Sequence, residues 1–103
     1  MIKIRKTPAF EEWISSLRAK EQAQVQARLF RIEKFGHFGD CKAIEGVECS
    51  LFELRWNNGW RLYFYRDGVS SIIILLGGKK NDQKKDIKKA VALYRRYAHC
   101  EES

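Results

Sequence analysis

At 103 residues, with 45% hydrophobic and 13% aromatic residues, the chain is long enough for one folded domain over residues 1–103 and too short for two. Twenty lysines and arginines against thirteen aspartates and glutamates give a net charge of +7, which favours a polyanionic partner, either nucleic acid or an acidic protein. No stretch has the apolar length of a signal peptide or a membrane span, so we expect a cytoplasmic protein that does not contact a membrane.

The first predicted elements are a short strand and two helices. Ile2 and Ile4 alternate with charged residues, as in a strand with one apolar face. Thr7 and Pro8 predict the N-cap and the first residue of a short amphipathic helix. A second helix is predicted over residues 20–35, and the short connection between the two predicts an antiparallel helical hairpin.

Three antiparallel strands are predicted after a polar connection over residues 37–45. The apolar period changes to two from Val47 onward, and two short segments rich in Asn, Asp and Gly have the composition of hairpin turns. We therefore expect a meander made of a strand from about residue 47, a turn at 57–59, a strand at 60–65, a turn at 67–68 and a strand at 69–76.

The last of these strands leads into a strongly basic segment. Ile72 to Leu76 is an unbroken aliphatic run, which predicts a strand at the centre of the sheet, ended by Gly77 and Gly78. A final helix is predicted from about Asp82 to Cys100. The fold class is α+β: an N-terminal strand, a helical hairpin, a three-stranded antiparallel meander and a C-terminal helix, with the helices on one face of the sheet.

Arg55 and Arg61 are the principal candidates for a functional site. Both fall on the side of their strands opposite the main apolar residues, and a short hairpin joins these strands, so the two guanidinium groups are predicted to converge. Glu53 and Glu48 are possible internal ion-pair partners. The functional alternative is a phosphate site, because a guanidinium group binds phosphate in a bidentate manner.

Further candidates for substrate binding lie near the two arginines. Lys79 and Lys80 leave the end of the neighbouring strand and add positive charge there, and Lys84 begins the final helix, where it guides RNA electrostatically or meets a protein partner. Tyr63 and Tyr65 share a strand face with the second arginine. Each either stacks on a nucleobase or packs beneath a helix.

The remaining chemistry-bearing residues form no recognisable motif. Cys41, Cys49 and Cys100 are widely spaced and are expected to be free thiols, and neither His37 nor His99 lies in a catalytic pattern. We expect no metal and no cofactor. Metal-free RNA cleavage fits the residues available, since the 2′-hydroxyl of RNA attacks and protein cations stabilise the phosphorane.

Five segments carry a resemblance to a known family, in unchanged order along almost the whole chain: Phe10-Glu11-Glu12-Trp13, Phe38-Gly39-Asp40-Cys41-Lys42, Phe52-Glu53-Leu54-Arg55, Gly59-Trp60-Arg61-Leu62-Tyr63-Phe64 and Leu75-Leu76-Gly77-Gly78-Lys79-Lys80. Together they resemble the phage-derived, HigB-like killer proteins of the RelE/ParE toxin superfamily. The resemblance implies the RelE-like fold, and it implies the toxin of a type II toxin–antitoxin module, neutralised by a helix-turn-helix antitoxin.

The resemblance also implies a mechanism, namely cleavage of mRNA on the ribosome without a metal ion. By matching positions, Arg61 is expected to stabilise transition-state charge, Arg55 to position the phosphate, and Lys79 to transfer a proton or make a further phosphate contact. The C-terminal segment is predicted to be a helix, which leaves the general acid unassigned. The alternatives are a ParE-like toxin that binds DNA gyrase and a non-catalytic nucleic-acid-binding module.

Overall fold

The computed structural model describes residues 1–47 and 49–102, and of residues 99–102 it describes the backbone alone. Glu48 and the side chains of His99 and Cys100, considered above, therefore lie outside the described residues. The elements in chain order are β1 (Lys3–Lys6), α1 (Pro8–Ser15), α2 (Ala19–Phe35), β2 (Cys41–Ala43), β3 (Phe52–Arg55), β4 (Trp60–Arg66), β5 (Ser71–Lys79), the 3₁₀ turn η1 (Lys80–Asp82) and α3 (Gln83–Glu102).

The strands form one mixed sheet in the order β1-β5-β4-β3-β2. β1 runs parallel to β5, and the other pairs are antiparallel, so the predicted meander is confirmed as β3-β4-β5. The central strand is β4, and the prediction that placed Ile72 to Leu76 at the centre is wrong by one strand. The sequence analysis also missed β2 in its polar connection. This strand has three residues, none of them buried, so the alternation that identifies a strand was absent.

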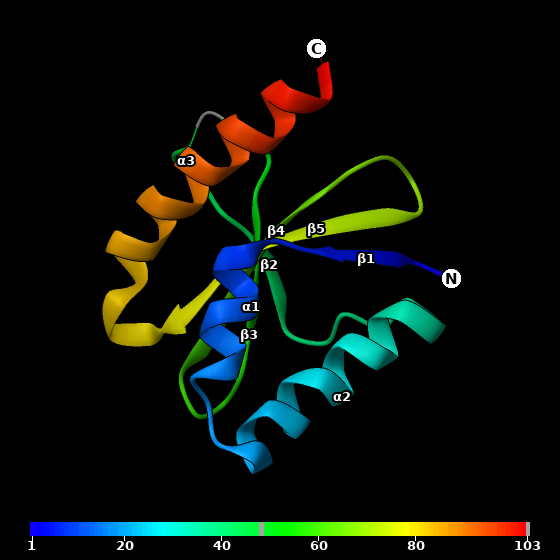
Figure 1. The fold of residues 1–103 in the computed structure, drawn as a ribbon, viewed down its shortest axis with the longest axis vertical. Coiled ribbons are helices and arrows are strands. Elements are labelled where there is room, and N and C mark those ends of the chain that lie inside the picture. The colour runs from blue at the N-terminus through cyan, green and yellow to red at the C-terminus, as the bar shows by residue number, and fades with distance from the viewer. Residues whose placement is uncertain (48, 103) are drawn as a thin grey trace.

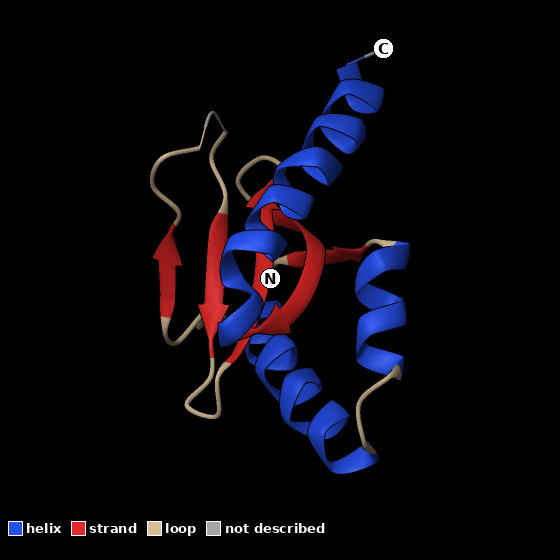
Figure 2. Cartoon of the chain, turned by 90° about the vertical axis from the view of Figure 1, so that its left-hand side faces the viewer, coloured by secondary structure: helices blue, strands red, loops and turns tan. Residues whose placement is uncertain are grey.

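Helices cover both faces of the sheet, which corrects the expectation of one covered face. In Figure 1, α3 and α2 lie on opposite sides of the strands. Leu62 and Phe64 of β4 join the core beneath α1 and α2, whereas Tyr63 and Tyr65 join a second core with Ala90 of α3. β4 is therefore apolar on both sides, and each side needs a helix to exclude water. Figure 2 shows α3 crossing the strands and extending past them at its C-terminal end.

β5 does not end at its two glycines, contrary to prediction, and runs on through them to Lys79. A Cβ at Gly77 would collide with the ring of Trp13 on α1, and a Cβ at Gly78 would collide with the carboxylate of Asp86 on α3. The end of β5 thus passes between the two helices, where a residue with a side chain does not fit. Close approach of other groups, and not a turn, explains the two glycines.

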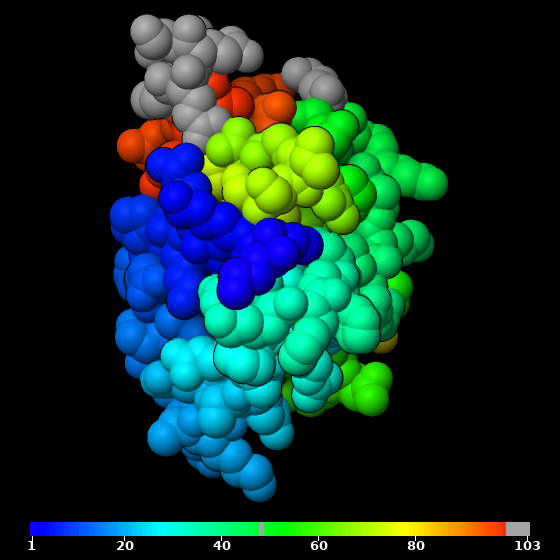
Figure 3. Space-filling model, turned by 90° about the vertical axis from the view of Figure 1, so that its right-hand side faces the viewer, coloured from blue at the N-terminus to red at the C-terminus, as the bar shows by residue number. Residues whose placement is uncertain are grey.

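The predicted start of α1 and the predicted end of α2 are confirmed. Thr7 caps α1, because its Oγ1 accepts a hydrogen bond from the Phe10 amide at 3.2 Å and donates one to the Leu75 carbonyl at 2.7 Å. Gly36 ends α2 in the left-handed conformation, with a φ of 69°. Figure 3 shows the N-terminal strand lying between the β4–β5 hairpin and α2. No helix among the described residues is long and apolar enough to cross a membrane.

A candidate anion site beneath the first turn of the C-terminal helix

The structure brings Arg55 and Arg61 together as predicted. They are direct partners in the β3–β4 register and lie on the sheet face that α3 covers. Their Nε atoms lie 3.7 and 3.9 Å from Oε1 of Glu53, which sits between them. We call these three side chains the arginine site. The side chain of Arg55 is 36% exposed, whereas that of Arg61 is 7% exposed, so solvent reaches the site from the Arg55 side.

Glu53 links the arginine site to α3. Its carboxylate is buried and accepts hydrogen bonds from Nε2 of Gln83 at 2.9 and 3.2 Å. Gln83 is the first residue of α3, so its hydrogen bonds to Glu53 connect the arginine site to the N-terminal end of α3. Of the two acids predicted as internal partners, Glu53 therefore pairs with both arginines. One carboxylate between two guanidinium groups leaves a net positive charge in a mostly buried place.

The three lysines predicted to bind the substrate lie on consecutive segments, from the end of β5 to the first turn of α3. Lys79 ends β5 directly after Gly78, the register partner of Arg61, and its side chain is exposed. Lys80 begins the 3₁₀ turn, and its amide donates to the Gly59 carbonyl at 2.7 Å. Lys84 is exposed on the first turn of α3. Lys79 is thus the lysine held by the sheet itself, one residue from the strand position that faces Arg61.

Tyr63 and Tyr65 do not form an exposed stacking surface, which corrects one of the two alternatives above. They are 0% and 4% exposed and pack beneath α3. The ring of Tyr65 contacts the ring of Tyr94 edge-on, with 4.8 Å between the ring centroids. Burial, followed by the negative charges of Glu53 and Asp86, raises the pKa of the Tyr63 hydroxyl above its ordinary value. Neither ring is available to a nucleobase in this arrangement.

Asp86 is a potential site residue that the sequence analysis did not identify. It is 7% exposed, and its Oδ2 has no hydrogen-bond partner among the described residues. Burial raises the pKa of this carboxyl, Asp82 raises it further, and Lys89 and Lys85 oppose the shift. In the sequence Asp86 resembles any acid in the first turn of a helix. Its position against Gly78 depends on how α3 packs across β5.

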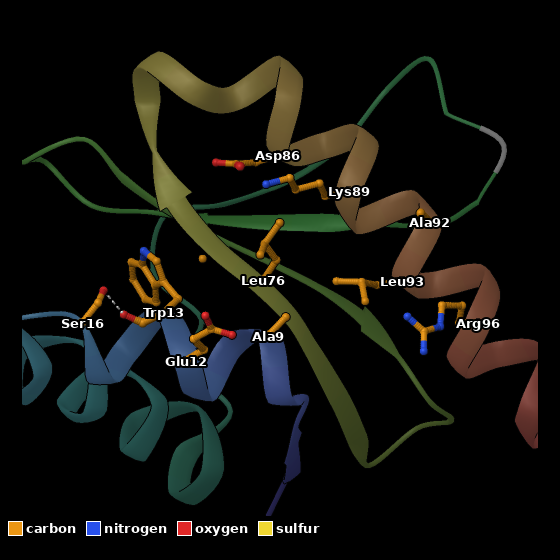
Figure 4. A pocket seen from close by; sticks show the side chains of 11 residues that line it. Ala9, Glu12, Trp13, Ser16, Leu76, Asp86, Lys89, Ala92, Leu93 and Arg96 are labelled. Atoms are coloured by element: carbon orange, nitrogen blue, oxygen red, sulfur yellow. Dashed lines mark hydrogen bonds between the residues drawn. The ribbon is translucent and has the colours of Figure 1, made fainter.

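A groove runs between α1 and α3 at the end of β5. Its wider part has a volume of about 600 Å³ and includes Gly77 in its lining, with Leu76 at its floor and Trp13 and Leu93 on opposite walls. A second part continues past Gly78 to Lys79 and Lys85, and Asp86 and Lys89 border both parts. We call this the α1–α3 groove. In Figure 4, Asp86 and Lys89 project from α3 above the end of β5.

The chain has a RelE-like fold. A mutant of Escherichia coli toxin RelE in the free state superposes with a TM-score of 0.67 at 13% identity, covering 88% of this chain and 95% of that chain. The RelBE2 toxin–antitoxin complex of Mycobacterium tuberculosis gives 0.64 at 18% identity, covering 76% and 90%. The RelE–RelB complex of Pyrococcus horikoshii gives 0.62 at 14% identity, covering 77% and 94%.

The sequence gives a more specific assignment than these distant structures. Residues 12–97 match the model of the phage-derived protein Gp49-like family (DUF891), and the chain belongs to this family. An uncharacterized protein of Haemophilus influenzae is 38% identical over 95 residues, which cover 89% of this chain and 92% of that protein. The resemblance to phage-derived members of the RelE/ParE superfamily is therefore confirmed.

Proposed function

We propose that this protein is the toxin of a type II toxin–antitoxin module and cleaves mRNA on the ribosome as a metal-independent endoribonuclease. The observation that carries the proposal is the pair of arginines in register on β3 and β4, with Lys79 at the end of the next strand. The RelE-like fold and the family membership support a toxin. Two of the similar structures are complexes with RelB antitoxins, which supports an antitoxin as partner; we expect one with a helix-turn-helix.

The arginine site supplies the groups that phosphodiester cleavage requires. Arg55, the more exposed guanidinium group, binds and positions the phosphate in a bidentate manner. Arg61, nearly buried beside it, stabilises the charge that develops on the phosphorane, and its low exposure strengthens that interaction. A phosphate bound at Arg55 competes with Glu53 for the same guanidinium group. Lys79 adds a point charge from the neighbouring strand, and Lys80 and Lys84 attract the RNA chain.

Mapping of mRNA ends after induced expression tests the proposal directly. Expression of the wild-type chain in growing bacteria is expected to stop growth and to create new 5′ ends inside translated reading frames, detected by primer extension. The purified protein is expected to cleave a defined mRNA when ribosomes are bound to it, and to leave a 5′-hydroxyl end. Supercoiling defects without new mRNA ends would indicate a gyrase-directed toxin, and growth without either effect would indicate a non-catalytic binding module.

A further inference from the structure

We propose that Asp86 is the catalytic acid of this site and protonates the leaving 5′-oxygen of the RNA. The inference rests on the proposed endoribonuclease function and supplies the proton donor that the sequence left unassigned. It is carried by three observations: the position of the carboxylate at Gly78, which is the register partner of Arg61 on the neighbouring strand; the absence of a hydrogen-bond partner for its Oδ2 among the described residues; and the groove that gives a substrate access to it.

The first observation is the position of the carboxylate. Gly78 is the register partner of Arg61, and Oδ2 of Asp86 lies where a Cβ of Gly78 would be. The carboxylate therefore stands over β5 on the same sheet face as the guanidinium group of Arg61, one strand away. Neighbouring positions on one face of a sheet are within side-chain reach of each other. A phosphodiester that contacts Arg61 at this end of β4 is therefore within reach of Asp86.

The second observation is that Oδ2 of Asp86 has no hydrogen-bond partner among the described residues. Buried polar atoms are almost always hydrogen-bonded, and an exception needs an explanation. Arg61 Nε and the Tyr63 hydroxyl also lack hydrogen-bond partners among the described residues, and the charges of Asp86 and Arg61 both act on that hydroxyl. Three polar atoms without a hydrogen-bond partner among the described residues thus lie in the region between β4 and the first turn of α3. Such a concentration is expected where a ligand completes the hydrogen bonds.

The third observation concerns the access of a substrate to Asp86. Although 7% exposed, Asp86 borders both parts of the α1–α3 groove, and Lys79 borders the same groove beyond Gly78. The lysines and arginines along the groove favour a phosphate chain, and Trp13 and Leu76 provide an apolar floor and wall that exclude water. Water exclusion strengthens hydrogen bonding and retains the proton on the carboxyl until it is transferred.

The charges around Asp86 are mixed. The titratable and charged groups that act on its charge, line the same groove or occupy neighbouring strand positions come from every element packed against it: Asp82 of η1, Lys85, Lys89 and Arg96 of α3, Arg61 and Tyr63 of β4, Lys79 of β5, Glu12 of α1, Arg18 before α2 and Glu21 of α2. Burial is the largest influence on Asp86 and raises its pKa, so a larger fraction is protonated near neutral pH than for an exposed aspartate.

The 2′-hydroxyl oxygen forms a bond to phosphorus while its proton passes to water. The bond between phosphorus and the 5′-oxygen breaks, and the proton of the Asp86 carboxyl passes to that oxygen. The products are a 2′,3′-cyclic phosphate and a 5′-hydroxyl end. The Asp86 carboxylate then regains a proton from solvent.

Single-turnover cleavage of a ribosome-bound mRNA over a range of pH tests the inference. Asp86→Asn keeps the shape of the side chain but cannot donate the same proton, so its rate is expected to fall by roughly 100-fold or more. The wild-type rate is expected to decrease on the alkaline side, as the carboxyl loses its proton, and the variant is expected to lack this decrease. Glu11→Gln, which removes one exposed negative charge from α1 outside the groove, is expected to match the wild type.

The outcomes separate the two proposals. If the wild type cleaves and a folded Asp86→Asn protein cleaves at the same rate with the same pH profile, the role of Asp86 is wrong and the endoribonuclease proposal stands. If the wild type inhibits growth but cleaves nothing, the proposed function itself is wrong. Gly78→Ala serves as a second variant should Asp86→Asn fail to fold, because its methyl group displaces the carboxylate. A folded Gly78→Ala protein with unchanged activity and pH profile would likewise overturn the inference.

Discussion

Nε of Arg61 lies 3.9 Å from Oε1 of Glu53, and the two side chains are 7% and 5% exposed. This contact holds a guanidinium group in a fixed position with its charge only partly neutralised, because Arg55 competes for the same carboxylate. An enzyme benefits from such preorganisation, since the cation need not be desolvated or reoriented when charge develops on the substrate. The same contact joins β3 to β4 through two buried side chains, so the site is also part of the folded core.

The first prediction concerns the charge of Arg61. Arg61→Ala is expected to abolish growth inhibition while the protein remains folded, because the phosphorane loses its principal stabilising cation. Arg61→Lys is also expected to be impaired, since an ammonium group cannot replace a planar bidentate donor. Growth after induction and thermal unfolding of the purified variants provide the measurement. Lys20→Ala, which removes an exposed charge on α2, is the matched control. A folded Arg61→Ala protein that remains fully toxic would exclude the site.

The second prediction separates the ring of Tyr63 from its hydroxyl group. Tyr63→Phe is expected to change the free energy of unfolding by less than about 0.5 kcal/mol, or to raise it, because the buried Tyr63 hydroxyl has no hydrogen-bond partner among the described residues. Tyr63→Ala is expected to lower the free energy of unfolding by about 3–5 kcal/mol, because it leaves a cavity in the core beneath α3. Urea denaturation measures both. Loss of cleavage in a stable Tyr63→Phe variant would show that the hydroxyl has a role in the reaction.

The third prediction compares the two glycines of β5. Gly77→Ala is expected to lower the free energy of unfolding by about 1–3 kcal/mol, because the added methyl group meets the rigid ring of Trp13. Gly78→Ala is expected to cost less, because its methyl group meets the end of the Asp86 side chain, which can rotate away. Adding Asp86→Ala to Gly78→Ala should recover stability, whereas adding it to Gly77→Ala should not. Equal recovery in both backgrounds would contradict the contacts described.

The fourth prediction concerns pH and stability. Because burial raises the pKa of Asp86 in the folded state above its unfolded value, Asp86 favours folding at acidic pH, and this contribution is lost as pH rises through the folded pKa. Asp86→Asn removes the charge, so its free energy of unfolding is expected to exceed that of the wild type at pH 7. The difference in the free energy of unfolding between the variant and the wild type should become smaller as pH falls towards the ordinary pKa of an aspartate. Urea denaturation at several pH values checks this.

A variant that gains stability while losing cleavage would match the usual conflict between function and stability at an active site. Asp86→Asn is expected to behave in this way, whereas a residue with a purely structural role would lose stability on substitution. An Asp86→Asn protein less stable than the wild type at pH 7 would therefore contradict the description of this carboxyl as buried, with no hydrogen-bond partner for Oδ2 among the described residues.

Local patterns in the sequence were sufficient for most elements and for the arginine pair. Helix and strand periods, the Thr7 cap, the glycine after α2 and the hairpin turns depend on residues close together in the chain. A short hairpin also fixes which residues face each other, which is why Arg55 and Arg61 could be paired before the structure was known.

The tertiary structure alone decided which face each helix covers, and with it the surroundings of the site. Alternation along β4 shows two sets of side chains but not that both are buried. The sequence therefore did not decide whether Tyr63 and Tyr65 bind a nucleobase or pack in the core. Gly77 and Gly78 suggested the end of a strand, and the position of Asp86 in the first turn of a helix suggested an ordinary exposed acid. Their true environment arises where α1 and α3 approach β5 from opposite faces, through contacts between residues distant in the chain, which no local pattern encodes.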